Sequence, residues 1–134
     1  MNTIITTVVT TLVQIVFCSM AGYAFGRIEF PFKNAIFILV LSVLMVPGQI
    51  FLLPQYQIVQ KLGLLDTIPA LFLPNLFSAF GTFLLRQFFM SLPKELEEAA
   101  IVDGCGRFRI FAQIMLPLIK NAMVTILMIS FMDV

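Results

Sequence analysis

The sequence contains no histidine, few charged residues and only two cysteines. Without histidine, the commonest general base in enzymes is missing. Cys18 lies in an apolar run and Cys105 in a polar stretch, so we expect no disulfide between them and no cysteine metal site. A glycine-rich loop ending in Gly-Lys-Ser/Thr is also absent, which means that another chain must bind any nucleotide. The sequence therefore predicts no catalytic, metal or cofactor site within this chain.

Apolar side chains dominate what is present. They make up 60% of the 134 residues, charged residues make up 11%, and the mean hydropathy is +1.06. A soluble domain of this length could not bury so many phenylalanine, leucine and isoleucine side chains. The net charge of +1 also argues against a nucleic-acid partner, which usually requires a basic face. We therefore expect an all-α membrane protein in contact with lipid.

Four apolar stretches are candidates to cross the ~30 Å hydrocarbon core of a bilayer. The first carries no charge, and no basic region precedes it, so a signal peptide is disfavoured. Pro47 and Gly48 predict a kink or an early end in the second stretch. The predicted spans are residues 4–25, 35–53, 69–89 and 118–134, in a single domain.

The basic residues predict the orientation of these spans. Seven of the eight, all except Lys61, fall on the same side when four spans alternate across the membrane. Basic residues collect on the cytoplasmic side of membrane proteins. The polar stretch between the third and fourth spans is therefore expected to face the cytoplasm.

This polar stretch, residues 91–117, is predicted to be a hairpin of two short helices. Residues 94–102 are mostly good helix formers, Ser91 is a candidate N-cap, and Pro93 is tolerated in the first turn. Asp103 and Gly104 are expected to end the first helix. Apolar residues resume at Phe108, Phe111 and Met115, and Pro117 marks a start or a kink.

Three carboxylates lie in the first helix of the hairpin, at Glu95, Glu97 and Glu98. Adjacent helical positions do not face a shared reacting centre, so we do not expect a paired-carboxylate active site. We interpret all three as a solvated face that the positive end of the helix dipole favours.

Seven residues of the hairpin carry a specific family resemblance. Their pattern resembles the signature loop of the membrane-spanning subunits of bacterial ATP-binding cassette (ABC) importers: Glu98, Ala99, Ala100, Gly104, Ile114, Leu116 and Pro117. Sequence segments outside the hairpin motif narrow the resemblance to carbohydrate-type permeases, akin to the smaller membrane subunit of maltose systems. These segments are Ala24-Phe25-Gly26-Arg27, Met45-Val46-Pro47-Gly48, Leu62-Gly63-Leu64 and Ser91-Leu92-Pro93. Such permeases generally have six spans, so the chain corresponds to their second to fifth and is expected to be a fragment.

The resemblance implies a permease subunit in the bacterial inner membrane. Its expected partners are a second permease, two ATPase subunits that bind ATP and Mg²⁺, and an extracytoplasmic solute-binding protein. In this family the first hairpin helix docks into a cleft on the ATPase, which implies docking roles for the seven motif residues and Asp103. ATP-driven closure of the ATPases would then switch the spans between inward-open and outward-open states.

Five polar side chains within the apolar stretches are candidates to line a solute pathway, because intramembrane polar groups usually face protein or water. They are Gln14, Tyr23, Asn75, Ser78 and Thr82. Helix–helix packing is the alternative role for each of them. The solute is expected to be a sugar or oligosaccharide; glycerol phosphate, an amino acid or an anion is the alternative. A truncated or non-transporting membrane protein remains a further alternative.

Overall fold

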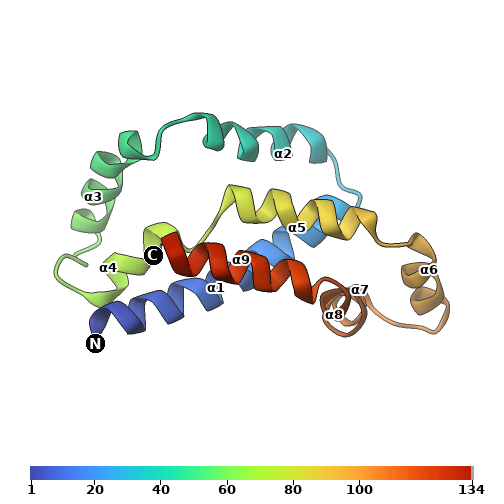
Figure 1. Cartoon of the computed structure of the whole chain (residues 1–134). Helices are drawn as coiled ribbons and strands as arrows, with labels where there is room; N and C mark the ends of the chain where they lie inside the picture. The colour runs from blue at the N-terminus through green and yellow to red at the C-terminus, as the bar shows by residue number, and fades with distance from the viewer. Residues whose placement is uncertain (134) are drawn as a thin grey trace.

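The computed structural model describes residues 1–133, and every regular element in that range is helical (Figure 1). The longer helices are α1 (Asn2–Arg27), α2 (Lys33–Ser42), α3 (Leu52–Lys61), α5 (Ala79–Ser91), α6 (Lys94–Val102) and α9 (Lys120–Asp133). The shorter ones are α4 (Ile68–Phe72), α7 (Arg107–Arg109) and α8 (Leu116–Leu118), the 3₁₀ turns η1 (Val43–Met45), η2 (Gly48–Phe51) and η3 (Leu73–Asn75), and the π-helical turn η4 (Ile110–Met115).

α1 is the one helix of the described residues that is long and apolar enough to cross a membrane unaided. Three further candidates are helix pairs with a sharp bend between them: 98° between Lys33–Met45 and Gly48–Lys61, 47° between Ile68–Asn75 and Ala79–Ser91, and 78° between Arg107–Leu118 and Lys120–Asp133. The first bend falls at Pro47, as the sequence predicts. Proline lacks an N–H and disfavours a helical conformation of the preceding residue.

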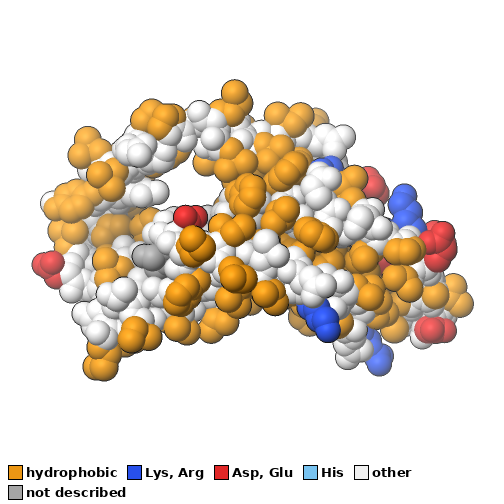
Figure 2. All heavy atoms as spheres, in the orientation of Figure 1, with side chains coloured by type: hydrophobic (Ala, Val, Ile, Leu, Met, Phe, Trp, Pro, Cys, Tyr) orange, Lys and Arg blue, Asp and Glu red, His pale blue; other side chains and the backbone are white. Residues whose placement is uncertain are grey.

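Residues 33–61, which we call the arch, curve over one side of the molecule and contact α1 and α5 through α2 and η1 (Figure 1). Phe37 is the single buried residue of the arch. Its ring lies 5.3 Å from the ring of Phe25 and 6.3 Å from that of Phe83, between centroids, and the guanidinium of Arg86 lies 4.2 Å from its centroid. Figure 2 shows hydrophobic side chains along the whole length of the arch.

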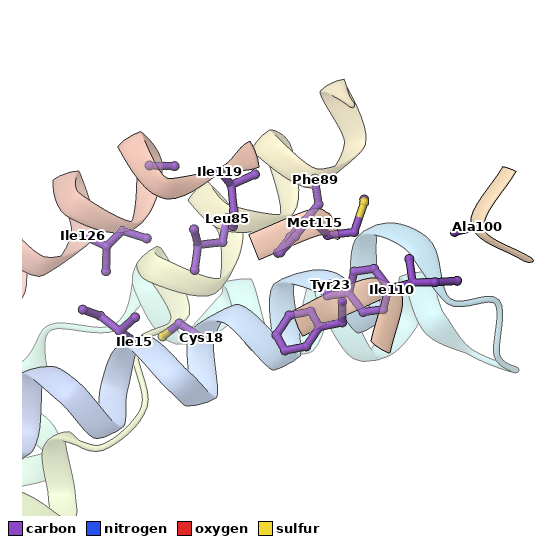
Figure 3. Packing of buried hydrophobic residues seen from close by; sticks show 12 residues of the cluster. Ile15, Cys18, Tyr23, Leu85, Phe89, Ala100, Ile110, Met115, Ile119 and Ile126 are labelled. Atoms are coloured by element: carbon purple, nitrogen blue, oxygen red, sulfur yellow. The ribbon is translucent and has the colours of Figure 1, made fainter. Parts of the chain in front are cut away.

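α1, α5 and α9 form the packed bundle, with α1 in extensive contact with α5 (Figure 1). In Figure 3, Ile15 and Cys18 of α1 lie toward Leu85 of α5 and Ile126 of α9. A Cβ atom added at Gly22 would lie 3.0 Å from Leu85 Cβ and 3.1 Å from the backbone nitrogen of Arg86. Glycine at this position therefore allows the two helices to approach closely.

Candidate functional site

The first hairpin helix, α6, has the predicted bounds, Lys94–Val102. Its predicted cap is wrong, because Ser91 is the last residue of α5 and its hydroxyl donates to the Phe88 carbonyl at 2.6 Å. Pro93 occupies the N-cap position and has no side-chain cap. Glu95 and Glu97 lie in the first turn, where the positive end of the helix dipole favours negative charge.

α6 ends in a glycine turn that needs no help from other parts of the chain. Gly104 has φ +83°, its N–H donates to the Ile101 carbonyl at 3.0 Å, and the N–H of Cys105 donates to the Ala100 carbonyl at 3.0 Å. This is the Schellman pattern, which satisfies the last carbonyls of a helix. A left-handed φ is readily accessible to glycine and strained for other residues. Gly104 therefore reverses the chain as the sequence predicts.

The second half of the hairpin is one helical stretch with a π-helical turn in its middle. It comprises α7, η4 and α8, over Arg107–Leu118. Phe111 and Met115 are buried, whereas Phe108 is 73% exposed. Pro117 lies inside this stretch, and the bend comes after it, at Ile119.

The motif residues divide into an exposed and a packed set. Glu98, Ala99, Asp103, Gly104 and Pro117 are exposed, Ile114 and Leu116 are half-buried, and Ala100 is buried. Ala100 belongs to the hydrophobic cluster that includes Ile110 (Figure 3). Exposed apolar side chains surround the exposed motif residues, at Leu96, Ile101, Val102 and Phe108. The outer face of the hairpin thus combines carboxylates with apolar side chains, a composition suited to binding another protein.

Glu97 corrects the sequence interpretation, because it is buried rather than part of a solvated face. Its carboxylate accepts a 2.8 Å hydrogen bond from the Tyr23 hydroxyl. One carboxylate oxygen lies 3.8 Å from a guanidinium nitrogen of Arg27, and the other lies 4.0 Å from one of Arg107. Buried charges are retained in proteins when they are paired in this way.

Arg27 also holds the connection between α5 and α6. One of its guanidinium nitrogens donates to the carbonyl of Leu92, and its side chain is only 4% exposed. Arg27 is the last residue of α1, so its positive charge also lies at the favoured end of that helix. Arg27 therefore binds both ends of the segment from Leu92 to Glu97 to the end of α1, in addition to the hydrogen bond between Tyr23 and Glu97.

Three of the five candidate pathway residues meet in one cavity of about 220 Å³: Gln14, Asn75 and Ser78. Ser130 and Asp133 of α9 line the same cavity, and the sequence analysis did not single them out. An acidic residue within a predicted membrane span is the signal that could have identified Asp133. Asn75 and Asp133 also border a second cavity of about 280 Å³ beside Thr6 and Thr7.

The other two candidates lie elsewhere. Tyr23 bonds to Glu97, and Thr82 is fully buried with its hydroxyl donating to the Ser78 carbonyl at 2.9 Å. Within the described residues, several buried side-chain oxygens of α1 have no hydrogen-bond partner: those of Thr6, Thr10, Thr11, Gln14 and Ser19. Such groups are costly in an apolar environment.

Comparison with known proteins places this architecture in a family. Residues 14–134 match the family described as "Binding-protein-dependent transport system inner membrane component". The chain is 41% identical, over 117 residues, to the arabinooligosaccharides transport system permease protein AraQ of Halalkalibacterium halodurans, which covers 87% of this chain and 42% of the relative. It is 38% identical, over 130 residues, to the sn-glycerol-3-phosphate transport system permease protein UgpE of Rhizobium meliloti, and this match covers 97% of this chain and 46% of the relative.

A solved structure shows the same fold. The chain superposes with a TM-score of 0.90 and 25% identity on the crystal structure of a bacterial ABC transporter involved in the import of the acidic polysaccharide alginate. That match covers 98% of this chain and 46% of the other. The chain therefore spans less than half the length of the relatives that it matches, and it belongs to the family of binding-protein-dependent transport system inner membrane components.

Proposed function

We propose that this chain is the permease part of an ATP-driven importer, and that its hairpin docks on an ATPase subunit. The exposed face of α6 carries the proposal, because Glu98, Ala99 and Asp103 are open to a partner at the end of the molecule where α6 projects (Figure 1). Small side chains there permit a close approach, and the carboxylates can accept hydrogen bonds or form ion pairs. ATP and Mg²⁺ would be bound by the partner and not by this chain.

In this proposal the chain crosses the bacterial inner membrane several times. α1 is one span, the bent helix pairs of residues 33–61 and 68–91 contain the predicted spans 35–53 and 69–89, and α9 supplies the described part of the predicted span 118–134. The distribution of basic residues supports a cytoplasmic hairpin. A second permease, two ATPases and an extracytoplasmic binding protein would complete the importer.

The solute we propose is a sugar or oligosaccharide. The 220 Å³ cavity presents the amides of Gln14 and Asn75 and the hydroxyls of Ser78 and Ser130, together with the aromatic side chain of Phe80. Such groups exchange hydrogen bonds with a neutral, hydroxylated solute. Among the described residues, the lining contains the carboxylate of Asp133 and no lysine or arginine.

Glycerol phosphate is the second candidate, because the UgpE relative of Rhizobium meliloti is named for its transport. Recognition of a phosphate favours arginine, lysine or a helix N-terminus, so the basic groups would have to come from outside the described residues that line this cavity. Uptake of arabinose oligosaccharides and of glycerol 3-phosphate by the complete importer distinguishes the two. An amino acid or another anion as the solute, or no transport at all, would contradict the proposal of a sugar.

Docking is tested by co-purification of the ATPase subunit with two hairpin variants. Gly104→Pro cannot adopt φ +83°, and Ala100→Glu places a charge where the structure has a buried methyl group. We expect both variants to insert into the membrane and to lose the ATPase and solute uptake. Gly63→Pro, at the other left-handed glycine with open surroundings, controls for turn disruption in general. Normal uptake by either hairpin variant would overturn the proposal.

The side of the membrane is tested by labelling Asp103→Cys with an impermeant thiol reagent in a Cys105→Ser background. We expect labelling in inside-out vesicles and none in intact cells. Lys61→Cys should show the opposite pattern, because it lies on the other side in the proposed topology. Labelling of Asp103→Cys from outside intact cells would contradict a cytoplasmic hairpin.

A further inference from the structure

We infer that Glu97 and Arg27 form a joint through which movement of the docked hairpin is passed to α1. The inference rests on the proposed function, because it concerns the route that force takes inside this chain. The chain itself connects the hairpin to α5 and to α9. The joint adds a polar connection to α1, a helix more than sixty residues earlier in the sequence, beside the aromatic contact between Tyr23 of α1 and Phe111 of the hairpin.

The position of α6 makes such a connection necessary. α6 projects from the end of the bundle, and its main packing partner is η4, which is also part of the hairpin (Figure 1). Residues Leu92 and Pro93 link α6 to α5 without helical structure. A short non-helical link can bend at its backbone dihedral angles, so α6 would tilt against the bundle if nothing else held it.

Side-chain contacts remove that freedom. Arg27 bonds to the Leu92 carbonyl inside the link and pairs with Glu97 one turn into α6, so it holds two points of the segment at once. Tyr23 adds a direct 2.8 Å hydrogen bond to the same carboxylate. The side chains of Arg27 and Glu97 are 4% and 10% exposed, so water screens their attraction less than it would at a surface. Because Leu92 and Glu97 are both bound to the end of α1, the orientation of α6 relative to α1 is fixed as well as its distance from α1.

α1 is suited to receive the force because it is tightly packed against α5. Added Cβ atoms at Gly22 and Gly26 would lie 3.0 Å and 3.4 Å from atoms of α5, so the two helices have little room to slide. α1 also contacts α9 and contributes Gln14 to the 220 Å³ cavity. A tilt of α6 would therefore move the helix that lines the proposed solute pathway.

Charge alone does not explain why Glu97 has this role and its neighbours do not. Glu95 and Glu98 are exposed on the same helix, and no ion pair of theirs lies within 4.0 Å among the described residues. Glu95 is therefore a matched control, because Glu95→Gln makes the same chemical change on the same helix without touching the joint.

The test measures ATP hydrolysed and solute transported by the complete importer with this chain in place. We expect Glu97→Gln to keep the ATPase subunit and its hydrolysis while transport per ATP falls by about tenfold, within the 5- to 150-fold range of typical coupling between sites. Arg27→Gln should behave similarly. Because the two residues act through each other, the double variant should be little worse than either single variant. Glu95→Gln should transport like the unaltered protein.

Three results would overturn the inference. Unchanged transport by Glu97→Gln would show that no force passes through the pair, and additive losses in the double variant would show that the residues act separately. Loss of the ATPase from Glu97→Gln would mean that the residue only shapes the docking surface. Failure of the proposed function itself looks different, because the unaltered chain would then fail to bind an ATPase. Thermal unfolding of each variant identifies one that has simply lost its fold.

Discussion

The bundle of α1, α5 and α9 and the arch of residues 33–61 are both strongly apolar, but they pack in opposite ways. Ile15, Leu85, Phe89 and Ile126 of the bundle are buried, whereas Phe37 alone is buried in the arch. Apolar side chains can face lipid as readily as protein, so hydropathy does not distinguish the two regions. Small and hydroxylated residues do distinguish the two regions, because Gly22, Ser19 and four threonines lie on the buried side of α1.

Leu85→Ala is expected to have the largest effect on this comparison. The leucine is fully buried between helices, and its truncation leaves a cavity whose walls lose their packing contacts. We expect a loss of about 2 kcal/mol or more in the free energy of unfolding in detergent. Leu52→Ala in the arch, where the leucine is 71% exposed, is the control and should change little. Equal losses would mean that the arch is packed as tightly as the bundle.

Gly22→Ala is expected to cost less, about 1–3 kcal/mol, because the new methyl group would press on the backbone of α5. The matched variant is Gly48→Ala, since nothing lies within 4 Å of a Cβ at that position. Thermal unfolding of the two variants side by side measures the difference. A stable Gly22→Ala protein would show that the α1–α5 contact can yield.

Phe37→Ala should release the arch and leave the bundle in place. The substitution removes the ring that contacts Phe25, Phe83 and the Arg86 guanidinium, an aromatic and cation–π cluster worth about 1 kcal/mol. Hydrogen exchange should become faster in residues 33–45 and stay unchanged in α1. Faster exchange in α1 as well would show that the arch supports the bundle.

Glu29→Gln should produce the smallest effect. Its carboxylate lies 3.5 Å from the Lys33 ammonium nitrogen, but the glutamate side chain is 92% exposed, and exposed ion pairs add little stability. We expect no measurable shift of the unfolding temperature. A clear shift would indicate that the loop before α2 is held by charge rather than by Phe37.

Local sequence signals predicted several backbone features of the chain correctly. The bounds of α6, the turn at Gly104 and the break at Pro47 each follow from the conformational preferences of a few neighbouring residues. The role of Ser91 was predicted wrongly, because α5 extends to that residue and its hydroxyl bonds back to Phe88.

The role of Glu97 could not be predicted in the same way. In sequence it looks like Glu95 and Glu98, and its burial depends on Tyr23 and Arg27, which lie about seventy residues away. The grouping of Gln14, Asn75 and Ser78 in one cavity likewise depends on how α1 meets the start of α5. The docking role of the hairpin motif and the pathway role of Gln14, Asn75 and Ser78 stay predictions.

The π-helical turn at Ile110–Met115 affects how far the residues after it can rotate about the axis of the hairpin's second helix. Its wider winding holds about one residue more per turn than an α-helix. If that turn tightened to regular winding, every later residue would advance by one position and rotate by about 100° around the axis. The surplus residue therefore allows the two ends of the hairpin's second helix to rotate against each other, at the cost of exchanging the i→i+5 hydrogen bonds of the turn for i→i+4 bonds.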